Sequence, residues 1–106
     1  MNQKRLNRLK RRLDGLRSAP ANITRRKLVA LAKSLGMRQE KRGKEPTYVN
    51  DDFPHLTPLS IPSHPGALNK FTAKDILDDL DEYIFQWDEF LRQNQAKLKL
   101  KGPHDE

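Results

Sequence analysis

The sequence predicts an α+β fold, in which helices pack against a small three-stranded antiparallel sheet. Apolar residues recur every three or four positions before residue 36 and after residue 72, which is typical of amphipathic helices. Between these segments lie short runs rich in β-branched and aromatic residues, separated by glycine, proline, asparagine and aspartate. Strands that are grouped between helices, instead of alternating with them, favour an antiparallel sheet covered on one face.

Residues 1–19 are predicted to form a basic amphipathic helix that precedes the main domain. Its apolar stripe consists of Leu6, Leu9, Leu13 and Leu16, and seven Lys and Arg side chains cover the other faces. Three interpretations are open: the leucines dock the helix on the rest of the chain, the cations bind a nucleic-acid backbone, or the helix lies on an anionic membrane. We favour docking through the leucines, and the lack of an aromatic anchor disfavours the membrane.

The main domain is predicted to span residues 20–94 and to begin with a helix at residues 25–35. Thr24 is suited to cap the start of this helix, and Gly36 occupies the position where a left-handed residue ends a helix. Proline has no backbone N–H to donate, so Pro46 predicts that the second strand starts after it or lies at an edge. The three strands are expected at residues 37–42, 47–49 and 59–63.

A long final helix is expected from Thr72 onward, because Thr72 and Asp75 fit the spacing of a capping box. Its apolar stripe persists for about twenty residues, which is longer than a core of this size needs. Residues 83–91 are therefore expected to pack on the N-terminal leucine helix or on a partner. Residues 95–106 are charged and lack periodicity, so they are expected to form an unstructured tail.

The net charge of +7 is distributed unevenly along the chain. Residues 1–44 hold fifteen Lys and Arg against two acidic residues, whereas residues 45–106 hold six against twelve. A basic excess of this density favours a polyanionic partner, and RNA or DNA is the commonest one. The alternative is that the basic and acidic segments neutralise each other, within the monomer or across a dimer.

The composition also excludes several kinds of site. Because the chain has no cysteine, disulfides and thiolate metal sites are excluded, and its three scattered histidines give no metal-ligand spacing. The sequence holds no glycine-rich phosphate loop and no nucleophile elbow. No apolar run is long enough for a signal peptide or a membrane span, so a cytoplasmic location is the default expectation. We expect no metal, no cofactor and no membrane contact.

Four features of residues 24–80 form a recognisable pattern. A helix ends in Leu35-Gly36, a basic run at residues 41–44 leads through a glycine turn, a strand ends in Ile-Pro-Ser-His at residues 61–64, and a short loop enters a helix with an Ile-Leu pair at residues 76–77. In this pattern the chain resembles the HicA toxins, small ribonucleases of toxin–antitoxin systems. The resemblance implies an α-β-β-β-α fold like that of double-stranded-RNA-binding domains, here with an extra N-terminal helix.

The resemblance also implies RNA, and mRNA in particular, as the substrate and a HicB-type antitoxin as a partner. The family pattern places a Ser-His pair after the turn glycine, and that histidine is taken as catalytic; in this chain Glu45 stands at its position. RNA cleavage without a metal needs a base, an acid and cations at the phosphate. We hypothesise that Glu45 is the base and His64 the acid. The residues expected to bind RNA are Arg38, Lys41, Arg42, Lys44, Tyr48 and Lys70.

Other interpretations of the same residues stay open. Glu45 fits a solvated turn, and His64 fits the cap of a strand end. Tyr48 and Phe53 are suited to stack on bases, but core packing is the commoner role for at least one of them. The whole chain could therefore be a metal-independent endoribonuclease, a non-catalytic RNA-binding module of the same fold, or an interaction protein that forms homo-oligomers through its terminal helices.

Overall fold

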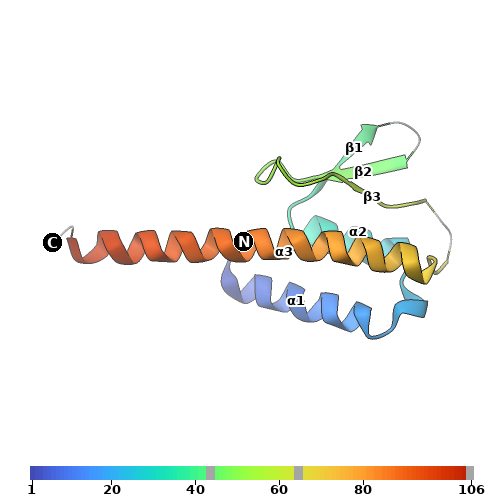
Figure 1. The fold of residues 1–106 in the computed structure, drawn as a ribbon, viewed down its shortest axis with the longest axis horizontal. Helices are drawn as coiled ribbons and strands as arrows, with labels where there is room; N and C mark the ends of the chain where they lie inside the picture. Colours follow the sequence, from blue (N-terminus) through green and yellow to red (C-terminus); the bar gives the residue numbers. More distant parts are fainter. Residues whose placement is uncertain (43–44, 64–65, 105–106) are drawn as a thin grey trace.

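The computed structural model is organised around one long helix, α3 (Lys70–His104), which contacts both other helices and the sheet. The structure describes residues 1–42, 45–63 and 66–104, and for residues 41, 42, 45 and 95–104 it describes the backbone alone. Figure 1 shows the sheet and α1 on opposite sides of α3, with α2 alongside it. The other elements are α1 (Gln3–Arg17), the 3-10 turn η1 (Pro20–Asn22), α2 (Arg25–Ser34), β1 (Arg38–Arg42), β2 (Glu45–Val49) and β3 (Leu59–Ser60).

The described part of the chain is thus an α+β fold with three α-helices and a small three-stranded antiparallel sheet, as the sequence predicts. The strand order is β1-β2-β3, so β2 is the central strand. The prediction that Pro46 precedes β2 or marks an edge is wrong, because Pro46 lies inside this central strand opposite Lys41. The Pro46 carbonyl accepts the N–H of Ile61 at 3.4 Å, and because the nitrogen and carbonyl of a strand residue point to the same side, the missing N–H faces the chain after β3 and costs the β1–β2 ladder no hydrogen bond.

Helix α1 packs on α3 through its leucine stripe, which confirms the docking interpretation. Leu6, Leu9 and Leu13 are buried, and Leu16 is partly buried against the same cluster. The two helices run antiparallel, since the start of α1 bonds to Asp88 and its end to Asp78. The leucine face is therefore covered within the chain and is not available for pairing with a second copy.

Helix α2 begins and ends where its sequence indicates. The Thr24 side chain accepts the N–H of Lys27 at 3.4 Å, and Gly36 has the positive φ of 87° that a helix end requires. The carbonyl of Leu35, left unpaired by the end of the helix, accepts the indole N–H of Trp87 at 2.8 Å and the amide of Asn50 at 3.0 Å. These two bonds fasten the end of α2 to α3 and to the loop after β2.

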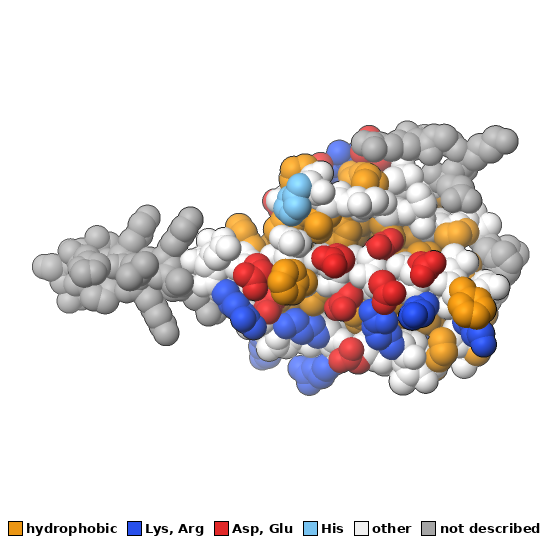
Figure 2. All heavy atoms as spheres, in the orientation of Figure 1, with side chains coloured by type: hydrophobic (Ala, Val, Ile, Leu, Met, Phe, Trp, Pro, Cys, Tyr) orange, Lys and Arg blue, Asp and Glu red, His pale blue; other side chains and the backbone are white. Residues whose placement is uncertain are grey.

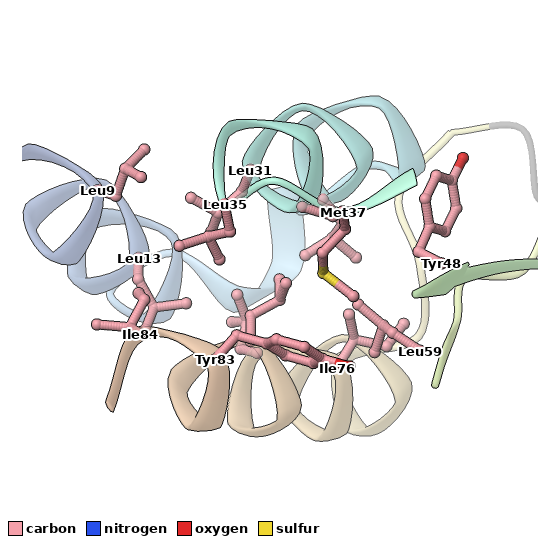
Figure 3. Packing of buried hydrophobic residues seen from close by; sticks show 14 of the residues in the cluster. Leu9, Leu13, Leu31, Leu35, Met37, Tyr48, Leu59, Ile76, Tyr83 and Ile84 are labelled. Atoms are coloured by element: carbon pink, nitrogen blue, oxygen red, sulfur yellow. The ribbon is translucent and has the colours of Figure 1, made fainter. Parts of the chain in front are cut away.

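The buried side chains from all three helices and the sheet form one hydrophobic cluster. Figure 3 shows Leu9 and Leu13 of α1 near Ile84 of α3, with Leu31 and Leu35 of α2 facing the same interior. On the sheet side, Leu59 and Met37 close the cluster over α3. The Tyr83 ring is buried, and its hydroxyl donates to the Thr57 carbonyl at 3.0 Å, which ties the loop before β3 to the helix.

Both ends of α3 differ from the predicted helix. It begins at Lys70, two residues before Thr72, because Asn69 acts as the cap: its side chain accepts the N–H of Phe71 at 2.8 Å. The backbone helix also continues to His104, where the sequence pattern predicts an unstructured tail from residue 95. Residues 95–101 consist of Gln, Ala, Lys and Leu, all good helix formers, so their propensity favours helix even without a periodic stripe.

Candidate nucleic-acid interface

The register of the sheet brings two predicted site segments to one end of it. Arg42 pairs with Glu45 at the last position of the β1–β2 ladder, so these two residues mark the hairpin end. Strand β3 runs antiparallel to β2, and after Ser60 the N–H of Ile61 bonds to the carbonyl of Pro46. The chain that leaves β3 toward Ser63 therefore runs alongside the first residues of β2, although about fifteen positions separate them in sequence.

For several predicted site residues, the structure describes the backbone without the side chain. Lys44 and His64 lie outside the described residues, and the side chains of Lys41, Arg42 and Glu45 lie outside them as well. The backbones of these last three residues are all at the hairpin end of the sheet. The fold therefore gathers these segments at one end of the sheet.

Arg38 lies at the other end of the sheet and is paired with an acid. It is opposite Val49, at the start of β1, and its guanidinium donates two hydrogen bonds to Asp51 at 2.8 and 3.1 Å. The Arg38 hydrogen bond is the main reason that the pKa of Asp51 lies below its ordinary value, and the same bond raises the pKa of Arg38. Arg38 is thus separated from the hairpin end and already has a carboxylate partner, so we leave it out of the interface.

Tyr48 is buried, so it is not part of the predicted RNA-binding surface. Only 1% of its surface is exposed, and its hydroxyl accepts a hydrogen bond from Arg25 at 3.4 Å. Phe53 is buried too, with its ring edge-on to Trp87 at a centroid distance of 4.9 Å. Neither ring presents a face on which a base could stack, so both aromatic candidates belong to the core.

Lys70 belongs to a different group of residues, which were not predicted to be neighbours from the sequence. It lies in the first turn of α3 and lines an open pocket that also involves the end of α1. We call this the Phe71 pocket; its lining residues are Arg17, Pro20, Lys70, Phe71, Lys74 and Leu77. The loop before α3 is held in place at Leu68, whose N–H donates to the Ile23 carbonyl at 2.8 Å, and by a bridge between Thr24 and Ala67.

Phe71 immediately precedes the helix expected from Thr72, so the predicted pattern gave it no role. The signal was nevertheless present in the sequence, since helical spacing places Phe71 opposite the stripe formed by Ile76, Leu80 and Trp87. Phe71 is 68% exposed, the largest value among the exposed large apolar side chains of the described residues. An aromatic residue opposite a helix's buried stripe is a candidate for external contact.

The outward face of α1 carries a second basic feature. Five cations point away from the leucine stripe and are exposed, and no ion pair among the described residues involves them. We call these the outer cations; they are Lys4, Arg5, Arg8, Arg11 and Arg12. Helical spacing sets them along about two turns of one face, which suits contact with successive phosphates better than with a single small anion.

Two further features, a cluster of metal-binding side chains and a membrane-spanning helix, are both missing from the described residues. Within them, no group of three or more His, Asp or Glu side chains is arranged to hold a metal ion. Likewise, none of the described helices combines the length and apolar character needed to cross a membrane. No family model, curated protein or solved structure matches the chain.

Proposed function

We propose that the chain is a HicA-like RNA-binding protein with a fold like that of double-stranded-RNA-binding domains. The observation that carries this proposal is the meeting of two segments, the start of β2 at Glu45 and the chain that follows Ile61, at one end of the sheet. The element order α2–β1–β2–β3–α3 is also the α-β-β-β-α order that the resemblance implies. Helix α1 is then an addition that extends the core on the far side of α3.

The charge distribution supports a polyanion as the ligand. The outer cations lie on an exposed helix face, where no acid in the described part of the chain pairs with them, and Lys70 and Lys74 add two more positive charges at the start of α3. Phosphate contacts of this kind supply affinity without sequence specificity. The resemblance to HicA toxins is the reason for preferring RNA to DNA as the ligand. A binding experiment therefore also tests the choice of nucleic acid.

The proposed reaction is metal-independent cleavage of mRNA in the cytoplasm, controlled by a HicB-type antitoxin. In it, Glu45 takes the proton of the ribose 2′-hydroxyl while His64 protonates the leaving 5′-oxygen, and the basic residues of the hairpin hold the phosphate. A second candidate function, RNA binding without cleavage, is favoured by one specific feature. Glutamate at position 45 is a weaker base than the histidine of the family pattern unless its surroundings raise its pKa.

The test is incubation of the full chain with a labelled single-stranded RNA in the presence of EDTA. Wild type is compared with His64→Ala and Glu45→Gln, and His55→Ala serves as the matched control because His55 lies in the loop before β3, edge-on to Phe53. Cleavage that persists in the control and is lost in both site variants supports the ribonuclease. Intact RNA that still shifts on a native gel supports the binding module, and absence of both cleavage and binding overturns the proposal.

A further inference from the structure

We infer that the Phe71 pocket is a nucleotide-binding subsite, in which an RNA base stacks on Phe71 while the adjoining phosphate contacts Lys70 and Lys74. The inference rests on the proposed RNA-binding function and deepens it, since it names an aromatic contact that the resemblance does not supply. It depends only on side chains that the structure describes.

The apolar part of the pocket is suited to a flat ring. Phe71 is 68% exposed, and beside it lie the ring of Pro20 and the buried side chain of Leu77. Because Phe71 is opposite the buried stripe of α3, its ring contributes little to the core. An exposed ring on a rigid helix offers a stacking surface that every base can use, and such stacking is insensitive to sequence.

The charged part of the pocket is suited to a phosphate. The Lys70 ammonium lies 5.4 Å from the centroid of the Phe71 ring, so a positive charge is held directly at the aromatic group. Arg17 is already bonded to Asp78 at 2.9 Å. Neither Lys70 nor Lys74 has a carboxylate within 4 Å among the described residues, so both are available to an external anion. The positive end of the α3 dipole adds to the potential there.

The combination of these two parts selects a nucleotide. A small inorganic anion would gain nothing from Phe71, and an apolar ligand would leave the cations without a partner. A nucleotide joins a flat ring to an anionic group in one molecule, which matches a pocket that holds an aromatic ring and two lysines. An acidic peptide with an aromatic residue is the competing ligand, and the experiment below distinguishes it.

The pocket also lies where an RNA strand could reach both sites. Figure 1 shows the start of α3 at the same end of the molecule as the hairpin end of β1 and β2. Only six positions separate Lys70 from His64 in sequence. A single strand that passes the hairpin end can therefore place a neighbouring base on Phe71.

Phe85 provides a matched control on the same helix. It is 56% exposed, nearly as much as Phe71, but the side chains that share its pockets include Asp81 and Glu82, and the cation there, Lys10, is paired with Asp88. Figure 2 shows a band of acidic side chains over this part of α3. A base stacked on Phe85 would bring its phosphate toward carboxylates, so the two phenylalanines have the same ring and opposite electrostatic surroundings.

The experiment measures the binding of fluorescently labelled single-stranded RNA by wild type, Phe71→Leu, Lys74→Gln and Phe85→Leu. We expect Phe71→Leu to weaken binding about fivefold or more, the fold-change that corresponds to the usual contribution of one base–aromatic stack. Phe85→Leu should bind like wild type. An RNA with abasic nucleotides keeps every phosphate, so it should be insensitive to Phe71→Leu and still be weakened by Lys74→Gln.

Each outcome separates the inference from the function on which it rests. If wild type binds RNA and Phe71→Leu binds equally well, the subsite is wrong and the proposed function stands. If wild type binds no RNA, the proposed function fails and the subsite fails with it. If Phe71→Leu abolishes binding of a labelled glutamate-rich peptide and leaves RNA binding unchanged, the pocket takes a protein ligand and the inference is overturned.

Discussion

The cations of α1 divide into two sets with different surroundings. Lys10 and Arg17, beside the leucine stripe, reach carboxylates of α3: Lys10 lies 3.5 Å from Asp88, and Arg17 lies 2.9 Å from Asp78. The outer cations lie on the outward face of α1 and along the other edge of the stripe, and they have no such partner among the described residues. The same helix is therefore partly neutralised on one edge and uncompensated on the other.

The difference shows how the uneven charge of the sequence is resolved in the fold. Two interpretations of the basic half were open, neutralisation by the acidic half and binding of a polyanion. The leucine stripe sets the orientation of α1, and the orientation decides which cations meet α3. Among the described residues, carboxylates reach the flanking cations Lys10 and Arg17 and none reaches the five outer cations, which favours an external partner for the latter.

The largest expected effect comes from removing the packing that orients α1. Leu13 is buried between α1 and α3 beside Ile84, so Leu13→Ala removes transfer free energy and leaves a cavity. We expect the free energy of unfolding to fall by about 2–5 kcal/mol, measured by urea denaturation. Leu16→Ala is the matched control, because Leu16 is only partly buried and should have a smaller effect. Equal effects for the two variants would contradict the docking of α1 through this stripe.

A smaller effect, on affinity alone, is expected from the outer cations. Arg8→Gln with Arg11→Gln removes two exposed charges that pair with no acid in residues 1–42, 45–63 and 66–104 as described, so stability should change by less than about 0.5 kcal/mol. If both contact phosphates, the slope of log K against log salt for single-stranded RNA should decrease in magnitude by about 1.4.

The paired cations supply the control for that experiment. Lys10→Gln with Arg92→Gln removes the same charge from a place outside the Phe71 pocket where the Asp88 carboxylate already offsets it. We expect this variant to keep most of the salt dependence of wild type. If both double variants lose the same slope, the outer cations have no special role and net charge alone accounts for binding.

The fold was largely predictable because its signals are local. Helical spacing gives the buried face of each helix, and Gly36 gives the end of α2, because no other residue adopts its φ so readily. The start of β2 was predicted less well. The cost of a proline in a strand depends on whether a neighbouring strand requires a hydrogen bond from its backbone nitrogen. That pairing is set by β3, more than ten residues away.

The candidate site was harder to predict because it depends on tertiary arrangement. Alternation along β2 does not reveal which face is covered by helices, so Tyr48 could not be assigned to the core from the sequence. Arg38 and Lys41 are close in sequence, but the strand sets their backbones at different positions along the sheet, and Arg38 is bonded to Asp51. Phe71 meets Arg17 and Pro20 only because α1 returns antiparallel to α3.

The smallest expected effect concerns the acids that α1 neutralises, and it appears as a pH dependence. Asp88 is only 13% exposed in its side chain, and burial raises its pKa. The hydrogen bond from Gln3 and the charges of Lys10 and Arg92 together outweigh burial, so the pKa of Asp88 lies below its ordinary value. Because the pKa of Asp88 is lower in the folded chain than in the unfolded chain, the ionised carboxylate stabilises the fold. This stabilisation is fully present above about pH 4 and is lost as the pH falls through the folded-state pKa.

Asp79, on the same helix, has a pKa that is shifted in the opposite direction to that of Asp88. Burial, reinforced by the charges of Asp75, Asp78 and Glu82, raises the pKa of Asp79, so its ionised form is disfavoured in the folded chain. We expect Asp88→Asn to lower stability at pH 7 by on the order of 1 kcal/mol and Asp79→Asn to raise it slightly, with both differences vanishing in strong acid. Urea denaturation across pH 3 to 7 measures both. A destabilising Asp79→Asn would show that this carboxylate has a favourable partner, and a neutral Asp88→Asn would show that α1 is held by its leucines alone.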